Sequence, residues 1–505
     1  MVNIFRSICG LPSVAYSWQR GTPALRLLFC TPSTALSGGI KVIFELINRL
    51  GSRGIDADLF SFAGGPLWFP LHARVLPQKN LEDVDFSAYD FVLLSNAFMV
   101  PMALSHTNHR GIIYFCQDYE SFHHARGLSY AECVRDSPAM ARIYQFPVPI
   151  VAISRSIQQL VKERAGRDSY FMPLGIDKDI FRPQPRKPRA APHRILLVGN
   201  YLISHKGMRD GLDALAMLGR EHPVQLVLVT QESRNREVLE RCACPVEIHY
   251  CCPPERVPQV MSTCDAYCCT SWYEGFGLPA VEAFHCGLPV VSTRTMGVSD
   301  YGIDGVNLLL AQPNDPADLR EKLERVLLDL ALQARLIEGG FATVQNRFDW
   351  ETSLGAFLSA LEEIQNSPGA SEPSDPATMN ALLAGLEREG SLTPIAVFRQ
   401  FQKLAKEVEE LLALTISRSE LSPADAAYLA GLRDQFAIYL ENPRAEYYDA
   451  FKEKYDLCRL ALSLRDSERC TEYLQLIRNR GRGDARPSHG GRDPSPLVEI
   501  RYSHA

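Results

Sequence analysis

Short apolar runs alternate with amphipathic segments along residues 25–365. The run Leu25–Cys30 predicts a buried strand, and the apolar positions that follow the turn 31–39 have helical spacing as far as Gly51. Those positions are Ile40, Ile43, Phe44, Ile47 and Leu50. The same pattern predicts strands at 55–62, 89–95, 111–116 and 150–154, and a helix at 155–164 with Ser154 as its cap.

The second half of this region repeats the alternation. Strands are predicted at 194–199, 224–230, 246–250, 266–270, 288–292 and 308–311, and helices at 319–330 and 350–364. Strands that alternate with helices are typical of parallel α/β sheets. Between the two halves, the proline-rich and basic stretch 183–192 predicts a stiff linker. The chain is therefore expected to form two doubly wound α/β domains.

The remaining chain has a different pattern. Residues 366–378 are rich in Ser, Pro and Ala and predict a second linker, and 379–480 have few strand signals. Apolar residues from Phe398 to Leu411 recur at intervals of three and four, which predicts an all-helical appendage. Its apolar stripe is expected to face its own core, and a protein partner or a membrane surface is the alternative. The tail 481–505 is predicted to be disordered.

Composition narrows the class of protein. The chain has 505 residues, of which 46% are hydrophobic and 22% charged, with a formal net charge of -6. These values are ordinary for a water-soluble protein of two to four domains and give no basic signature of nucleic-acid binding. Neither the arm 1–22 nor the apolar window 91–104 is a sustained apolar segment, so no secretion signal or membrane span is expected.

Seven cysteines fall between Cys242 and Cys269, without the paired spacing of structural zinc sites. Free cysteine packs as a small hydrophobe, so core thiols are the favoured interpretation over a metal site. A reducing, cytoplasmic location fits that interpretation, and association with the cytoplasmic face of a membrane stays open.

The densest chemistry lies in Ser271–Val291. Gly275 and Gly277 allow backbone amides to approach a ligand, and Pro279 suits the start of a helix. A helix start favours an anion such as phosphate. Glu274 and Glu282 flank this turn. Carboxylates would repel phosphate, so they are expected to accept hydrogen bonds from neutral hydroxyls, as a nucleotide sugar would offer.

The block Glu274-Gly-Phe-Gly-Leu-Pro279, with Glu282-Ala283 and Gly287-Leu-Pro-Val-Val291, resembles the donor-site signature of retaining GT-B glycosyltransferases of the GT4-like, group 1 family. The resemblance covers about 25–365. It implies two Rossmann-like doubly wound domains that face across a cleft. It also implies a set of donor-binding residues: Gly38, Gly39, Asn200, Lys206, Glu274, Gly275, Phe276, Gly277, Leu278 and Glu282.

Within that set, the resemblance assigns Glu282 to the ribose hydroxyls and Glu274 to a sugar hydroxyl. Lys206 would stabilise the charge that grows on the departing diphosphate. Gly38 and Gly39 would hold the diphosphate by their amides, with glycine for turn shape alone as an equal alternative. The family usually has an arginine where this chain has Asn200, so one of two expected cations is missing. Arg209 or His205 would replace it, or the pocket would rely on backbone amides alone.

A polar cluster follows the predicted strand 111–116. Gln117, Asp118, His123 and His124 come at the end of a buried parallel strand, where ligands bind in doubly wound folds. Many family members have a histidine followed by an aspartate here, whereas this chain has Gln117 before Asp118. Asp118 joins Glu274 and Lys206 as the catalytic candidates. Gln117, His123 and His124 are acceptor-side candidates, with solvent-facing loop histidines as the alternative.

The resulting domain prediction places an N-terminal arm at 1–22, an acceptor-side Rossmann-like domain at 23–182, a linker at 183–192, a nucleotide-sugar domain at 193–365, a linker at 366–378, a helical extension at 379–480 and a tail at 481–505. The predicted activity is retaining transfer of a sugar from a nucleoside-diphosphate sugar to a glycan or lipid-linked acceptor, without a metal. A GT-B epimerase or phosphorylase is one alternative, and a catalytically weakened core that acts as a binding or assembly protein is another. Glycoside hydrolysis is disfavoured, because Glu274 and Glu282 follow one another along a loop and helix start.

Overall fold

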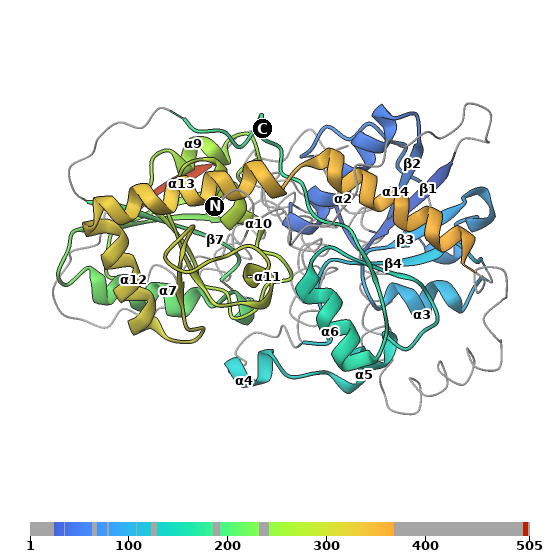
Figure 1. The fold of residues 1–505 in the computed structure, drawn as a ribbon, viewed down its shortest axis with the longest axis horizontal. Helices are drawn as coiled ribbons and strands as arrows, with labels where there is room; N and C mark the ends of the chain where they lie inside the picture. Colours follow the sequence, from blue (N-terminus) through green and yellow to red (C-terminus); the bar gives the residue numbers. More distant parts are fainter. Residues whose placement is uncertain are drawn as a thin grey trace, which may run out of the picture.

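The structure is a computed structural model (Figure 1). It describes residues 25–34, 36–62, 68–77, 80–107, 109–122, 129–184, 192–201, 203–231, 242–367 and the strand 498–502. The predicted arm 1–22, the helical extension 379–480 and most of the linker 183–192 lie outside the described residues. No helix of the described part combines the length and the apolar character that crossing a membrane requires.

The first half of the described chain forms a six-stranded parallel sheet with the strand order β2-β1-β3-β4-β5-β6. The strands are β1 (Arg26–Thr31), β2 (Asp56–Ser61), β3 (Phe91–Leu94), β4 (Ile112–Cys116), β5 (Ile150–Ala152) and β6 (Tyr170–Phe171). The first five confirm the strands expected from the apolar runs. The two-residue β6 was not expected, because both of its residues are only half-buried and no apolar run marks it.

Helices connect these parallel strands. They are α2 (Gly38–Ser52), α3 (Met99–Leu104), α4 (Tyr130–Cys133), α5 (Pro138–Ile143) and α6 (Arg155–Ala165), with short 3-10 helices η1 (Leu81–Asp83) and η2 (Phe86–Ala88). The predicted cap of α6 is confirmed, since the Ile157 amide donates to Ser154 Oγ at 3.1 Å. The helix ends at Gly166, whose φ of 69° is left-handed.

The second half forms a seven-stranded parallel sheet with the order β12-β11-β10-β7-β8-β9-β13. Its strands are β7 (His193–Val198), β8 (Val224–Thr230), β9 (Val246–Tyr250), β10 (Ala266–Cys269), β11 (Val290–Thr293), β12 (Leu309–Ala311) and β13 (Val498–Tyr502). The strand β13 lies within the predicted tail 481–505, of which the structure describes only residues 498–502, so the prediction for the rest of that tail stays a prediction. The strand has a β-branched and aromatic sequence, and it adds to the edge of the sheet beside β9.

The helical elements of the second half are η3 (Ser204–Lys206), α7 (Met208–Leu218), α9 (Val257–Met261), α10 (Leu278–His285), α11 (Met296–Ser299), α12 (Pro316–Leu328), α13 (Leu330–Arg347) and α14 (Trp350–Asn366). The expected helix 350–364 is α14, which leaves the second domain and crosses the first (Figure 1). Phe357 of α14 lies 6.3 Å from Phe29 and 6.4 Å from Phe115, measured between ring centroids. Helix α14 therefore connects the second domain to the core of the first.

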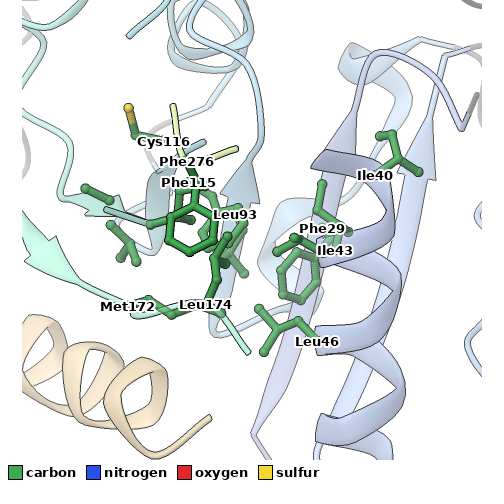
Figure 2. Packing of buried hydrophobic residues seen from close by; sticks show 14 of the residues in the cluster. Phe29, Ile40, Ile43, Leu46, Leu93, Phe115, Cys116, Met172, Leu174 and Phe276 are labelled. Carbon is green, nitrogen blue, oxygen red and sulfur yellow. The ribbon is translucent and has the colours of Figure 1, made fainter. Parts of the chain in front are cut away.

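Buried apolar side chains fill the space between the first sheet and its helices. Figure 2 shows Ile43 and Leu46 of α2 beside Phe29 of β1. Phe276, which comes from the second domain, belongs to the same buried cluster as Phe115. The prediction that the cysteines between 242 and 269 are mainly core thiols agrees with their burial, since only Cys251 of that group is partly exposed and all are free thiols. The core thus continues from one domain into the other at the base of the predicted donor loop.

Candidate functional site

The start of α2 lies where the two domains meet. Ser37 caps this helix by accepting a hydrogen bond from the Ile40 amide at 3.3 Å. Gly38 and Gly39 are therefore the first residues of the helix and not a turn before it. A Cβ atom added at Gly38 would lie 3.6 Å from the Leu278 side chain of the second domain, and one added at Gly39 would lie 3.3 Å from the side-chain nitrogen Nε2 of Gln117. Four of the predicted site residues therefore adjoin one another.

The predicted donor loop also packs against the first domain. Gly277 precedes α10 with a left-handed φ of 89°. A Cβ atom at Gly275 would lie only 2.4 Å from the Gln117 carbonyl oxygen. Gly297, whose amide donates to the Glu274 carbonyl at 3.1 Å, packs against Phe276 from the other side. Glycine at 275 therefore has a packing reason, namely the close approach of the Gln117 backbone, and its predicted contact with a ligand stays a prediction.

Lys206 and Glu274 form an ion pair at this loop. The Lys206 ammonium donates to Glu274 Oε1 at 2.8 Å, and Ser271 Oγ donates to the same oxygen at 2.5 Å. Burial alone would lower the pKa of Lys206, but the nearby Glu274 carboxylate raises the pKa above its ordinary value, so the lysine stays charged at neutral pH. The structure thus brings together two of the three predicted catalytic residues.

Gly207 explains how Lys206 reaches the loop. It has a left-handed φ of 56°, and a Cβ atom there would lie 2.0 Å from the Thr270 carbonyl oxygen. Thr270 Oγ1 in turn donates to the Lys206 carbonyl at 2.7 Å. Only glycine allows this close approach of η3 to the end of β10, so the Lys206-Gly207 pair is a structural unit.

A second ion pair crosses between the domains. The Lys41 ammonium, on α2, donates to Glu282 Oε1 on α10 at 2.7 Å, and the two side chains are 13% and 10% exposed. The same ammonium lies 3.9 Å from the centroid of the Phe181 ring. Sequence reasoning missed Lys41, because its partner is 241 positions away. Its position in the first turns of a helix with a Gly-Gly start was the only local signal.

Asp118 adds a third carboxylate. Burial raises the pKa of Asp118 to about 6, against the opposing effects of a hydrogen bond from the Tyr273 hydroxyl and the charge of Lys206. Glu274 raises it further, so Asp118 senses both members of the Lys206 pair. The Tyr273 hydroxyl also accepts a hydrogen bond from the Tyr119 amide at 2.7 Å. Tyr273, which sequence reasoning did not single out, thus links the donor loop to the first domain.

A second acidic group, Glu120, follows Asp118 by two residues. Glu120 accepts hydrogen bonds from the Ala97 amide at 3.0 Å and from the Tyr114 hydroxyl at 3.1 Å. Burial raises the pKa of Glu120 to about 8, and the charge of Asp118 adds to this shift. Glu120 therefore favours the protonated form near neutral pH. As pH rises, Asp118 loses its proton before Glu120 does.

The other predicted residues have the following places. Gln117 is half-buried, and its side-chain oxygen is buried beside Gly39. His123 and His124 lie outside the described residues. Asn200 is buried, 7% exposed, in the loop after β7. The two side chains weighed as replacement cations lie near this loop: Arg209 contacts Tyr201, and His205 packs edge-on against the Tyr273 ring.

Among the described residues, one group has the composition and spacing to hold a metal ion: Glu221, His222 and Glu324. It lies at the end of α7 and on α12. Arg320 donates to both glutamates, at 2.5 Å and 2.9 Å. Both carboxylates of this group are therefore already paired with one guanidinium. Metal independence of the predicted donor site stays a prediction.

Comparison with known proteins identifies the family. A family model described as Glycosyl transferases group 1 matches residues 192–329. The D-inositol 3-phosphate glycosyltransferase of Acidothermus cellulolyticus is 31% identical over 399 residues, which cover 66% of this chain and 88% of that protein. The MMP alpha-(1->4)-mannosyltransferase of Mycolicibacterium hassiacum is 27% identical over 227 residues, which cover 43% of this chain and 54% of that protein. The chain thus spans most of the first relative and about half of the second.

Solved structures agree on the fold. HepE of Anabaena, solved in complex with UDP-glucose, matches with a TM-score of 0.54 and 18% identity over 67% of this chain and 100% of its own. A glycosyltransferase of Rickettsia africae matches with a TM-score of 0.54 and 18% identity over 68% of this chain and 100% of its own. The two parallel sheets with their connecting helices are therefore the GT-B arrangement. The chain belongs to the group 1 glycosyl transferases, the GT-B family that its donor-loop motif predicted.

Proposed function

We propose that this protein is a retaining glycosyltransferase that moves a sugar from a nucleoside-diphosphate sugar to a hydroxyl of a glycan or lipid-linked saccharide. The observation that carries the proposal is the meeting of two lysine-glutamate pairs with a glycine-started helix between the domains. Lys206 pairs with Glu274 at 2.8 Å, and Lys41 pairs with Glu282 at 2.7 Å. Such a place offers acceptors for sugar hydroxyls and positive charge for a diphosphate.

The donor would lie across the two helix starts. In this proposal, Glu282 accepts hydrogen bonds from the ribose hydroxyls and Glu274 from a hydroxyl of the transferred sugar. The amides of Gly38 and Gly39, at the start of the 15-residue helix α2, bind the diphosphate together with those of Phe276 and Gly277. Lys206 supplies the fixed cation, and Asn200 and Leu278 complete the pocket wall.

The chemical step needs no nucleophile from the protein. The bond between the anomeric carbon and the phosphate oxygen breaks, and its electron pair goes to the departing diphosphate, beside Lys206. The acceptor oxygen bonds to the anomeric carbon on the same face, and its proton goes to the departing phosphate oxygen. Asp118 is proposed to contact the transferred sugar, with Gln117, His123 and His124 on the acceptor side. Lys206 contributes because negative charge is larger in the transition state than in the bound donor.

The relatives support the substrate class. HepE carries UDP-glucose in its solved structure, and the mannosyltransferase and the inositol-phosphate enzyme are named for sugar transfer. We propose from these a nucleotide-sugar donor for this chain, and no metal, because lysines and amides already face the predicted diphosphate. A cytoplasmic location at or near a membrane is proposed in addition, which fits the buried free thiols.

The test begins with a thermal-shift panel of UDP-, GDP-, ADP- and CDP-sugars, because a ligand that binds the native state raises its melting temperature. The stabilising donor is then incubated with cell-derived glycan and lipid-linked saccharide fractions, with its sugar isotopically labelled. The proposal expects label in a larger saccharide, with the anomeric configuration of the donor by NMR. Label that stays on the nucleotide with inverted ring stereochemistry would identify an epimerase, and phosphate-dependent release of a sugar phosphate would identify a phosphorylase.

A binding or assembly role is the second candidate, because Asn200 and Gln117 depart from the family pattern. Under that role, Lys206→Ala and Glu274→Ala would leave the cell's glycan unchanged, while removal of residues 379–480 would abolish it. The transferase proposal expects the two substitutions to remove the glycan.

A further inference from the structure

The Lys41–Glu282 ion pair joins the two domains at the residue proposed to bind the ribose. Lys41 lies on α2 of the first domain, and Glu282 lies on α10 of the second. Their side chains are only 13% and 10% exposed, and the Nζ to Oε1 distance is 2.7 Å. Taking a carboxylate out of water is costly unless it is paired with a cation. The first domain supplies that cation.

The Lys41 ammonium also contacts an aromatic ring. The ammonium lies 3.9 Å from the centroid of the buried Phe181 ring, within the range of a cation–π contact. The Phe181 carbonyl is bonded to Nδ1 of His285, which is the last residue of α10. A carbonyl only accepts hydrogen bonds, so Nδ1 carries the proton, and Nε2 accepts from the side-chain nitrogen Nε2 of Gln345 at 2.9 Å. Phe181 is thereby fixed to α10, the helix that also carries Glu282.

We infer that Lys41 is a positioning residue for ribose recognition: it holds the Glu282 carboxylate in place from the opposite domain. The inference rests on the proposed function. Lys41 uses one of the two carboxylate oxygens, and a carboxylate offers about four acceptor positions, so capacity for two ribose hydroxyls remains. The ribose site of the second domain is then complete only when the first domain is against it.

The competing explanation is that the pair merely ties the domains together. The two explanations differ in what they predict for the ribose hydroxyls. A domain tie would affect every nucleotide alike, whereas a positioning residue would affect only nucleotides that have the hydroxyls. The preference for a ribonucleotide over its dideoxy analogue therefore separates the two.

The experiment compares the full-length wild type with Lys41→Met, Lys41→Arg, Glu282→Gln and Lys41→Met/Glu282→Gln. Calorimetry measures Kd for UDP, GDP, ADP and CDP, and then for the 2′,3′-dideoxy form of the tightest binder. We expect Lys41→Met to weaken the ribonucleotide at least tenfold and the dideoxynucleotide less than threefold. Lys41→Arg is expected to keep part of the preference, because it keeps the charge. The matched control is Lys162→Met, which removes an exposed lysine paired with Asp168 in the same domain.

The combined variant tests whether Lys41 acts through Glu282. If it does, Glu282→Gln alone abolishes the ribose preference, and adding Lys41→Met changes the ratio no further. Equal weakening of both nucleotides in Lys41→Met and in Lys41→Arg, with unchanged melting temperature in the control, would overturn the inference and leave a domain tie. A wild type that binds none of the four nucleotides would instead refute the proposed function, and the inference with it.

Discussion

Replacing Lys206 by methionine tests the central charge of the proposed site. The substitution keeps the length of the aliphatic side chain and removes the ammonium that lies 2.8 Å from Glu274 Oε1. If that ammonium stabilises the departing diphosphate, removing it is comparable to removing one preorganised hydrogen-bond donor that stabilises the negative charge of a transition state. Such losses lower kcat by about 10²- to 10³-fold, or roughly 3–4 kcal/mol of transition-state stabilisation. The expected effect of Lys206→Met on kcat is therefore of this size.

The same substitution has a separate cost in stability. It leaves the Glu274 carboxylate, 15% exposed, without its cation, although Ser271 Oγ still donates to it. Exposed ion pairs contribute up to about 1 kcal/mol, and breaking fully buried ones costs about 3–5 kcal/mol. The Lys206 side chain is 27% exposed, so we expect the free energy of unfolding to fall by about 1–2 kcal/mol. Lys206→Met/Glu274→Gln should recover most of this loss, because no unpaired charge remains.

The two effects are measured separately. Single-turnover release of the nucleoside diphosphate reports the chemical step, and urea unfolding reports stability, with Lys162→Met as the matched lysine control. A kcat within threefold of the wild type, in a variant that is folded and binds the donor, would refute the role of Lys206. A raised KM with an unchanged kcat would contradict it as well, since it would mean that Lys206 stabilises the bound donor and the transition state equally.

Three further predictions follow from neighbouring contacts. A Cβ atom at Gly275 would lie 2.4 Å from the Gln117 carbonyl oxygen, so Gly275→Ala should push the domains apart. We expect this substitution to cost about 1–3 kcal/mol of stability and to lower kcat/KM at least tenfold. The control is Gly355→Ala, where a Cβ atom meets nothing within 4 Å, and it should be neutral or slightly stabilising. Asp300 accepts hydrogen bonds from the Arg155 and Ser156 amides at the start of α6, so Asp300→Ala should cost about 1–2 kcal/mol and raise the donor KM, whereas Asp168→Ala on the exposed surface should change neither. Burial raises the pKa of Asp118 to about 6 from an ordinary value of 3.8, so the ionisation of Asp118 lowers the free energy of unfolding as pH rises from about 4 to about 6. Asp118→Asn should remove this loss, which amounts to up to about 3 kcal/mol, and so flatten the curve of stability against pH in this range. A variant whose curve keeps its slope would contradict the burial argument.

The fold could be predicted from the sequence wherever a strand is a continuous apolar run. β1, β4 and β8 are buried almost throughout, and each was expected within one residue at either end. The helix α13 was missed: of its 18 residues only Leu332, Leu336, Gly340 and Val344 are buried, so its apolar stripe is narrow. The helix expected at 319–330 begins three residues earlier, at Pro316, with Asp315 as its cap.

The candidate site was predictable only in its local parts. Lys206 and the Glu274–Glu282 loop could be predicted, because each belongs to a short motif of neighbouring residues. The pairing of Lys41 with Glu282, in contrast, joins residues 241 positions apart, and Tyr273 reaches Tyr119 across 154 positions. No spacing rule connects side chains on different domains, because their contact depends on how the domains meet. The packing reason for glycine at 275 could not be found from the sequence for the same cause, since the obstructing atom belongs to Gln117.

The central claim is that one nucleotide sugar bridges the two domains at the two lysine-glutamate pairs. A crystal structure of the protein with the nucleotide sugar that stabilises it most tests this directly. The account predicts ribose hydroxyls within hydrogen-bond distance of Glu282, a sugar hydroxyl at Glu274, and the diphosphate between Lys206 and the start of α2. A donor bound with its diphosphate away from both helix starts, or on one domain alone, would contradict it.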